Sequence, residues 1–413
     1  MPNRQETQDR PPPTALERLA GALLLAAAVF MAFAGLGPAR AETLKIGLIL
    51  TYSGPEAAIG QQIDRGFALY LEQNSKALPP GTTIEIIRRD DTGPNPDVAK
   101  RLAQELITRE KVNMLAGVIW TPNANAIAPL ATQAKIPFLI LNAATSATTT
   151  LSPYIARVSL TLWQASYPLG RWAASAGAKK VYSITADYAP GHDGEEAFKA
   201  GLEKAGGAVV GSVRVPMSTR DFAPYFQRAK DSGPDAIYLF TPGQMATAAI
   251  KSYHELGLAQ AGIKLIGPAS ITSEDELPAL GEAALGIVSA SPYVVIGFTE
   301  ANTRFLEAWT ARYGADSRPT FQAVSGWDGM DAVFQIAQAM NGGPFAADKA
   351  MQSLKSWSNS ESPRGPVSMD PDTRDIVQNI YIARVERTGG KIANVPFHVF
   401  EAVKDPWKEL AKK

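Results

Sequence analysis

The sequence predicts an α/β fold made of two doubly wound lobes, each built around a parallel sheet. The chain has 413 residues, which is too long for one ordinary core and suits two domains of roughly 150 to 200 residues each. Short runs rich in Val, Ile and Leu alternate with segments of helical period, a pattern typical of parallel βαβ units. The alternation starts again at a helix expected over 163–176, so we expect two similarly built lobes.

The first set of units begins with a strand over 44–51, reading LKIGLILT, which stops at the turn Ser53-Gly54-Pro55. An apolar run bounded by a Gly/Pro turn is typical of a parallel strand covered on both faces. The elements expected after it are helix 60–74, strand 83–88, helix 97–109, strand 113–119, helix 124–134, strand 138–141 and a polar Thr/Ser loop over 143–152.

The second set repeats this rhythm after helix 163–176. The elements expected in it are strand 180–185, helix 195–205, strand 208–215, helix 222–232, strand 236–240, helix 245–256 and strand 264–266. A further segment over 286–294, helices over 300–313 and 320–341, and two strands over 379–386 and 395–400 complete the chain.

Those two late helices exceed what the second sheet needs, so the chain is expected to return to the first lobe near Ser291-Pro292. Lobe 1 is predicted to consist of residues 42–160 plus 292–365. Lobe 2 is predicted to consist of residues 161–291 plus 366–413.

The N-terminus has the features of a signal peptide. Three basic residues, Arg4, Arg10 and Arg18, precede an apolar run over 19–36, and Ala39-Arg40-Ala41 supplies a small-x-small cleavage pattern. Residues 1–41 are therefore predicted to be removed by cleavage after Ala41 during export. The alternative is a retained membrane anchor, for which a run of roughly 17 apolar residues is marginal.

Composition excludes several classes of function. Lys plus Arg and Asp plus Glu balance at 40 each, so there is no basic field for a phosphate backbone, and nucleic acid is not an expected partner. The chain contains no cysteine, which excludes disulfides, thiolate nucleophiles and iron–sulfur clusters. Its three histidines are widely spaced and leave little scope for zinc. No metal or cofactor is expected.

Common catalytic motifs are also missing. The sequence contains no G-x-S-x-G, H-E-x-x-H or G-x-x-x-x-G-K-[ST] pattern, so the chain is not expected to be an enzyme. The adjacent acids Asp90-Asp91 and Glu195-Glu196 are more typical of a solvated turn or of a first helical turn than of a metal or acid–base pair.

Candidate binding residues follow the strands, because ligands of open parallel sheets gather beyond the carboxyl ends of the strands. In the first set these residues are Ser53, Trp120-Thr121 and the segment 142–146, which contains Thr145. The hydroxyls of Thr121 and Thr145, with nearby backbone N–H groups, can bind a carboxylate without a cation. Alternatively, Ser53, Thr121 and Thr145 only cap their helices.

The second set offers larger side chains at the corresponding turns. Tyr188 and Gln244 can cover the far side of a ligand, and Ser270 follows a later strand. Trp120, Tyr188 and Phe240 lie at strand ends and predict a flat apolar pocket. Whether His192 or Trp327 contacts the ligand stays open; a lone loop histidine is more often solvated.

Four segments of the chain together carry a resemblance to a known family. They are LKIGLILTYSGPEAAIGQQIDRGFALYLE, VNMLAGVIWTPNANAIAPLATQAKIPFLILNAAT, DYAPGHDGEEAFKAGLE and YLFTPGQMATAAIKSYHELGL. The chain resembles the periplasmic solute-binding proteins of the leucine/isoleucine/valine-binding type, which serve ABC importers, over about residues 43 to 400. The occurrence of the four segments together in this order is specific, whereas each alone is weak.

The resemblance implies a type I periplasmic binding protein, with two lobes that close about a hinge. By position, Thr121, Ala143 and Thr145 correspond to the residues that hold the ligand carboxylate, and Ile59 lies near the ligand side chain. The implied setting is a monomer in the periplasm that delivers a small organic carboxylate to the permease subunits of an ABC transporter.

The resemblance also bears on the ligand. In amino-acid binders an acidic residue after a late second-lobe strand meets the ammonium, whereas here that turn reads Gly267-Pro268-Ala269-Ser270. An ammonium buried without an anion costs several kcal/mol. The TPNA and DYAPGHD segments resemble members that bind benzoate- or hydroxycinnamate-like acids, so an aromatic carboxylate is the predicted ligand. A branched-chain or other amino-acid binder, or a ligand-sensing regulatory domain of the same fold, are the alternatives.

Overall fold

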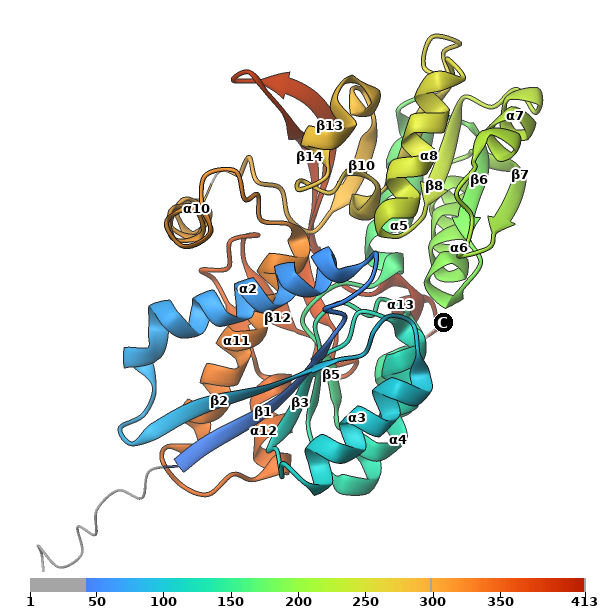
Figure 1. Cartoon of the computed structure of the whole chain (residues 1–413). Helices are drawn as coiled ribbons and strands as arrows, with labels where there is room; N and C mark the ends of the chain where they lie inside the picture. Colours follow the sequence, from blue (N-terminus) through green and yellow to red (C-terminus); the bar gives the residue numbers. More distant parts are fainter. Residues whose placement is uncertain (1–41, 298, 412–413) are drawn as a thin grey trace, which may run out of the picture.

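A computed structural model describes residues 42–297 and 299–411 and has two lobes, each with its own sheet (Figure 1). The predicted signal peptide lies outside the described residues. The first sheet has the strand order β2-β1-β3-β4-β5, and all its pairings are parallel. Its strands are β1 (Glu42–Leu50), β2 (Thr82–Asp90), β3 (Met114–Gly117), β4 (Phe138–Ile140) and β5 (Ile155–Arg157).

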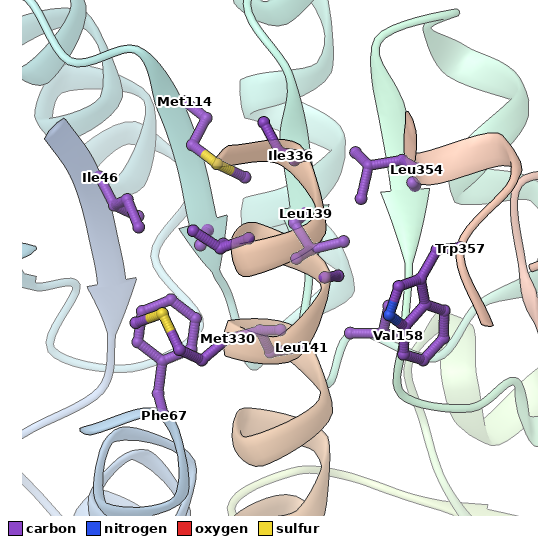
Figure 2. Close-up of a cluster of buried hydrophobic side chains, with 14 of the residues drawn as sticks. Ile46, Phe67, Met114, Leu139, Leu141, Val158, Met330, Ile336, Leu354 and Trp357 are labelled. Atoms are coloured by element: carbon purple, nitrogen blue, oxygen red, sulfur yellow. The ribbon is translucent and has the colours of Figure 1, made fainter. Parts of the chain in front are cut away.

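Helices cover both faces of the first sheet, as the predicted doubly wound arrangement requires (Figure 1). On one face pack α3 (Pro96–Thr108) and α4 (Thr121–Ala134). On the other pack α2 (Ala57–Asn74), α11 (Phe321–Met340) and α12 (Ala347–Lys355). In Figure 2, side chains of α11 meet those of β3 and β4 in this second layer. Two helices from late in the chain thus complete the first lobe.

The contact between α2 and α11 depends on two glycines. A Cβ on Gly66 would lie 1.8 Å from the carbonyl oxygen of Ala323, and one on Gly326 would lie 2.0 Å from that of Ile63. The helix backbones therefore touch directly at this crossing, which any side chain would push apart.

The second sheet is mixed, where the sequence predicted a parallel one. Parallel pairings join β7, β6, β8, β9 and β10, and β13 then adds to β10 in the antiparallel direction. The strands are β6 (Lys180–Ala186), β7 (Ala208–Val215), β8 (Ala236–Phe240), β9 (Lys264–Pro268), β10 (Val288–Ser291), β11 (Ser358–Asn359), β12 (Val367–Met369), β13 (Ile376–Thr388) and β14 (Lys391–Val403). β13 and β14 also pair in the antiparallel direction, because a short turn joins them into a hairpin.

The remaining α-helices all follow β5 in the chain. They are α5 (Leu162–Ser175), α6 (Ala189–Lys204), α7 (Ala223–Asp231), α8 (Gly243–Glu255), α9 (Leu277–Leu280), α10 (Glu300–Tyr313) and α13 (Pro406–Ala411), with short 3₁₀ helices η1 (Ser75–Ala77), η2 (Ser146–Leu151), η3 (Ala269–Thr272) and η4 (Gly281–Ala284). Within the described ranges, no helix combines the length and apolar character needed to cross a bilayer.

A buried ionic cluster fastens the junction between the lobes. The Arg157 Nε donates to Asp375 Oδ1 at 2.8 Å, and Lys408 of α13 forms an ion pair with the same carboxylate. Arg157 also donates to the carbonyl oxygens of Ala143 and Thr145, each at 2.8 Å. The lobe boundaries given by the sequence stay a prediction.

Candidate ligand-binding site

A pocket lies between the two lobes, with an empty volume of about 950 Å³ that includes space open to solvent. Its first-lobe wall comes from the β1–α2 loop, the start of α4 and the segment after β4; its second-lobe wall comes from the starts of α6 and α8 and the segment after β9. These are the carboxyl ends of parallel strands in both sheets, the position expected from the sequence.

Aromatic side chains form an apolar wall in this pocket. Trp120, Tyr188 and Phe240 all line it, with Ile59 beside them. The rings of Tyr188 and Phe240 are stacked, with centroids 6.1 Å apart and planes at 9°. A flat slot between or beside such rings accepts an aromatic ligand more readily than a branched one.

Trp120 is held in place by a buried chain of hydrogen bonds. Its indole N–H donates to Thr51 Oγ1 at 3.0 Å, and the Thr51 hydroxyl donates to Asp91 Oδ1 at 2.6 Å. The Asn123 amide donates to the other Asp91 oxygen at 2.8 Å. Asp91 is fully buried, so the interpretation of Asp90-Asp91 as a solvated turn is wrong for Asp91, which instead orients a residue of the pocket wall.

The hydroxyls of Thr121 and Thr145 are buried without a hydrogen-bond partner among the described residues. Thr121 begins α4 and Thr145 precedes η2, and neither side chain caps its helix. The alternative that these hydroxyls are caps is therefore wrong. Neither lines the pocket, although the adjacent Trp120 and Ala144 both do.

Four other predicted site residues have different surroundings. The Ala143 N–H donates to the Val118 carbonyl at 3.1 Å, so this group is already paired within the protein. Ser53 donates to Asp90 through its side chain and lines a neighbouring pocket together with Gln244. Ser270 lines the interlobe pocket, and its buried hydroxyl has no partner in the described part of the chain.

His192 and Trp327 lie outside this pocket. His192 is in the first turns of α6, which begins at Ala189 and thus six residues earlier than the predicted helix. Its Nε2 lies 2.8 Å from Asp187 Oδ1 on the surface. Trp327 lines a separate pocket near α2 and α10.

Three half-buried carboxylates line the interlobe pocket and were missed by sequence reasoning: Glu56 before α2, and Asp275 and Glu276 before α9. Burial raises the pKa of all three above their ordinary values, and the negative charge of Glu276 adds to the rise at Glu56. The pocket therefore contains acidic groups even though the turn at Ala269-Ser270 has none. Its described lining residues include no Lys, Arg or His.

The described residues contain no group of three or more His, Asp or Glu side chains arranged to hold a metal ion. The site can bind a flat apolar body and exchange hydrogen bonds with its polar groups.

Comparison with known proteins places this geometry in a family. The family model described as "Periplasmic binding protein" matches residues 43–391. The Leu/Ile/Val-binding protein homolog 6 of Brucella suis biovar 1 (strain 1330) is 40% identical over 387 residues, which are 93% of this chain and 97% of that protein.

Two solved structures are similar throughout. The solute-binding protein of an ABC transporter from Rhodopseudomonas palustris BisB5, in complex with 3,4-dihydroxybenzoic acid, has 45% identity and a TM-score of 0.83, covering 89% of this chain and 99% of that one. A second, from R. palustris in complex with 4-hydroxybenzoate, has 40% identity and a TM-score of 0.85, covering 90% of this chain and 100% of that one. The chain therefore belongs to the periplasmic binding protein family, as a non-enzymatic solute-binding protein of an ABC transporter.

Proposed function

We propose that this protein captures a small aromatic carboxylate of the hydroxybenzoate class between its two lobes and delivers it to the permease. The observation that carries the proposal is the stacked pair of Tyr188 and Phe240, which faces the interlobe pocket together with Trp120. The similar proteins of 40% and 45% identity bind 4-hydroxybenzoate and 3,4-dihydroxybenzoate, which supports the same class here.

The Thr121 and Thr145 hydroxyls are the proposed partners of the ligand carboxylate. They are the first side chains after β3 and β4 that combine burial with an unpaired oxygen, and each follows a residue of the pocket wall. A carboxylate that accepts hydrogen bonds from such hydroxyls and from backbone N–H groups is bound without a cation. Lobe closure around the ligand then shifts the population toward the form that the permease recognises.

Isothermal titration of the purified protein tests the ligand class. Benzoate, 4-hydroxybenzoate, 3,4-dihydroxybenzoate and leucine are titrated separately under one buffer condition. Binding of at least one of the aromatic acids, and tighter than leucine, is the expected result. Tight leucine binding without binding of any aromatic acid would refute the proposal.

A second candidate ligand is an amino acid, which the acids Glu56, Asp275 and Glu276 favour because an ammonium needs an anion. The same titration decides between the two classes. The aromatic wall favours the carboxylate with a ring.

Export to the periplasm, cleavage after Ala41, a monomeric state and an ABC permease as partner belong to the same proposal. Intact-mass measurement of the protein from a periplasmic fraction tests the cleavage site, with Glu42 expected as the first residue. Size-exclusion chromatography with light scattering tests the monomer.

A further inference from the structure

The two lobes bring acidic side chains together at one part of the interlobe pocket. The Glu56 carboxylate of the β1–α2 loop lies against the first turn of α8, where the backbone N–H of Gln244 donates to it. It is so close that a Cβ on Gly243 would lie 1.6 Å from Glu56 Oε2. The charge of Glu276, in the segment before α9, acts on Glu56 across this space. The two lobes therefore hold like charges near each other across the pocket.

Two of these acids, Glu56 and Glu276, have few hydrogen-bond donors around them. The Gln244 backbone N–H donates to Glu56, and the Thr247 hydroxyl donates to Glu276. Asp275, in contrast, accepts from the Ser273 hydroxyl at 2.7 Å, from the Gln62 side chain and from two backbone N–H groups. Because an ionised carboxylate has about four acceptor positions, Glu56 and Glu276 can accept further hydrogen bonds, whereas Asp275 is nearly saturated.

Two further side chains of the same pocket are buried and unpaired. Gln322 is 6% exposed and Thr320 is 2% exposed, and both line the pocket. The Gln322 Oε1 and the Thr320 Oγ1 have no hydrogen-bond partner among the described residues. Leaving such atoms unpaired costs about 1 to 3 kcal/mol each, so a ligand that supplies hydrogen-bond donors is favoured here.

The donors must come with a flat apolar body, because Tyr188, Phe240 and Trp120 line the same pocket. A phenolic hydroxyl meets both requirements, since it is a neutral donor on an aromatic ring. We propose that Glu56 and Glu276 accept hydrogen bonds from the ring hydroxyls of the ligand, so that the site selects hydroxylated aromatic acids over acids without a ring hydroxyl. The inference rests on the proposed function and adds the groups that set specificity within the class.

Titration of the wild-type protein with a matched series of ligands is the first half of the test. The series is 4-hydroxybenzoate, 3,4-dihydroxybenzoate, benzoate and 4-methylbenzoate, whose methyl group fills the space of the hydroxyl without donating. A hydrogen bond to a charged acceptor corresponds to roughly 10- to 100-fold in Kd. 4-Hydroxybenzoate is thus expected to bind about 10-fold or more tightly than 4-methylbenzoate.

Substitution of the acids is the second half. Glu56→Gln and Glu276→Gln replace a charged acceptor with a neutral one of the same shape. At least one of them should lower the ratio of the Kd for 4-methylbenzoate to the Kd for 4-hydroxybenzoate about 5-fold or more. Glu255→Gln, at the exposed end of α8, removes the same charge outside the pocket and should leave the ratio unchanged. The unfolding midpoint of each ligand-free variant checks that it is folded.

The possible outcomes separate this inference from the proposed function. If aromatic acids bind but 4-methylbenzoate and 4-hydroxybenzoate bind equally, or if both folded variants, of Glu56 and of Glu276, keep the wild-type ratio, the function stands and the acids do not set specificity. If none of the aromatic acids binds, both fall. Leucine binding that depends on the same acids would assign them to an ammonium and would overturn the inference.

Discussion

The paired substitutions Thr121→Val and Thr145→Val test the proposed grip on the ligand carboxylate. Both hydroxyls are buried and unpaired in the described structure, and Val keeps the shape of Thr while it removes the hydroxyl. In the ligand-free protein each substitution removes a buried hydroxyl that has no hydrogen-bond partner. The free energy of unfolding should therefore stay the same or rise by up to about 1 kcal/mol.

Ligand affinity should change in the opposite direction. If the Thr121 or Thr145 hydroxyl donates to the ligand carboxylate, its removal costs about 1 to 3 kcal/mol, which is roughly 5- to 150-fold in Kd. Urea unfolding of the ligand-free protein measures the first quantity, and isothermal titration with 4-hydroxybenzoate measures the second.

A third variant, Thr299→Val, is the matched control. The Thr299 hydroxyl caps α10 by accepting from the Asn302 N–H at 3.1 Å. Unlike Thr121 and Thr145, which each follow a residue of the pocket wall, Thr299 precedes a helix that contributes no residue to the pocket. Loss of the Thr299 hydroxyl should lower stability by about 1 kcal/mol and leave the affinity unchanged. Unchanged affinity in both the Thr121 and the Thr145 variants would refute the proposed grip.

Three further predictions concern stability. Gly326→Ala should cost roughly 3 kcal/mol or more in urea unfolding, because its Cβ would lie 2.0 Å from the Ile63 carbonyl oxygen on α2. Arg364→Met should cost about 4 kcal/mol in the same assay, because it leaves the fully buried Asp328, 2.9 Å from the guanidinium, without its counter-ion. Burial, and then the charge of a neighbouring acid, raise the pKa of Asp405 to about 6, so the folded protein holds this proton more tightly than the unfolded chain. The stability that this group contributes is complete below its ordinary pKa and is lost as the pH rises through 6. Asp405→Asn should therefore reduce the loss of unfolding free energy between pH 4 and 7 by up to about 3 kcal/mol. An unchanged pH profile of the unfolding free energy would contradict this prediction.

Much of the fold could be predicted from the sequence because parallel strands that are buried on both faces are continuous apolar runs. The runs at β1, β6 and β8 stand out for this reason. The three-residue strand β5 did not, because Ile155–Arg157 is too short to show a period and contains a charged residue. Its Arg157 is fully buried, since Asp375 from more than two hundred residues later pairs with it.

Helix α12 was missed for a different reason. It has nine residues, and only one side of it is buried: Ala350, Met351 and Leu354 face the first-lobe core. A short helix with a polar majority is hard to distinguish from a loop by composition, since packing rather than propensity stabilises it.

The sequence could predict those site residues that are aromatic and lie at the end of an expected strand. Trp120, Tyr188 and Phe240 are of this kind, and they line the pocket. Asp275 and Glu276 could not be predicted, because they lie seven and eight residues beyond β9, after η3, and adjacent acids ordinarily indicate a solvated turn. These acids line the pocket because of the tertiary path of the segment after β9. No local sequence pattern predicts that path.

This placement has an energetic consequence for lobe closure. The acids Glu56 and Glu276 belong to opposite lobes and line the same pocket, and burial raises the pKa of both, so a closed form without a donor between them carries an electrostatic cost. A ligand that supplies the donor removes this cost and also packs against the aromatic side chains of the pocket. Such a ligand therefore stabilises the closed form in two ways, through its own contacts and by removing the repulsion between the two carboxylates. Closure then depends on the presence of a suitable ligand. Selectivity and closure would thus depend on the same carboxylates, which is why a ligand that fills the pocket but lacks the hydroxyl should both bind more weakly and close the lobes less completely.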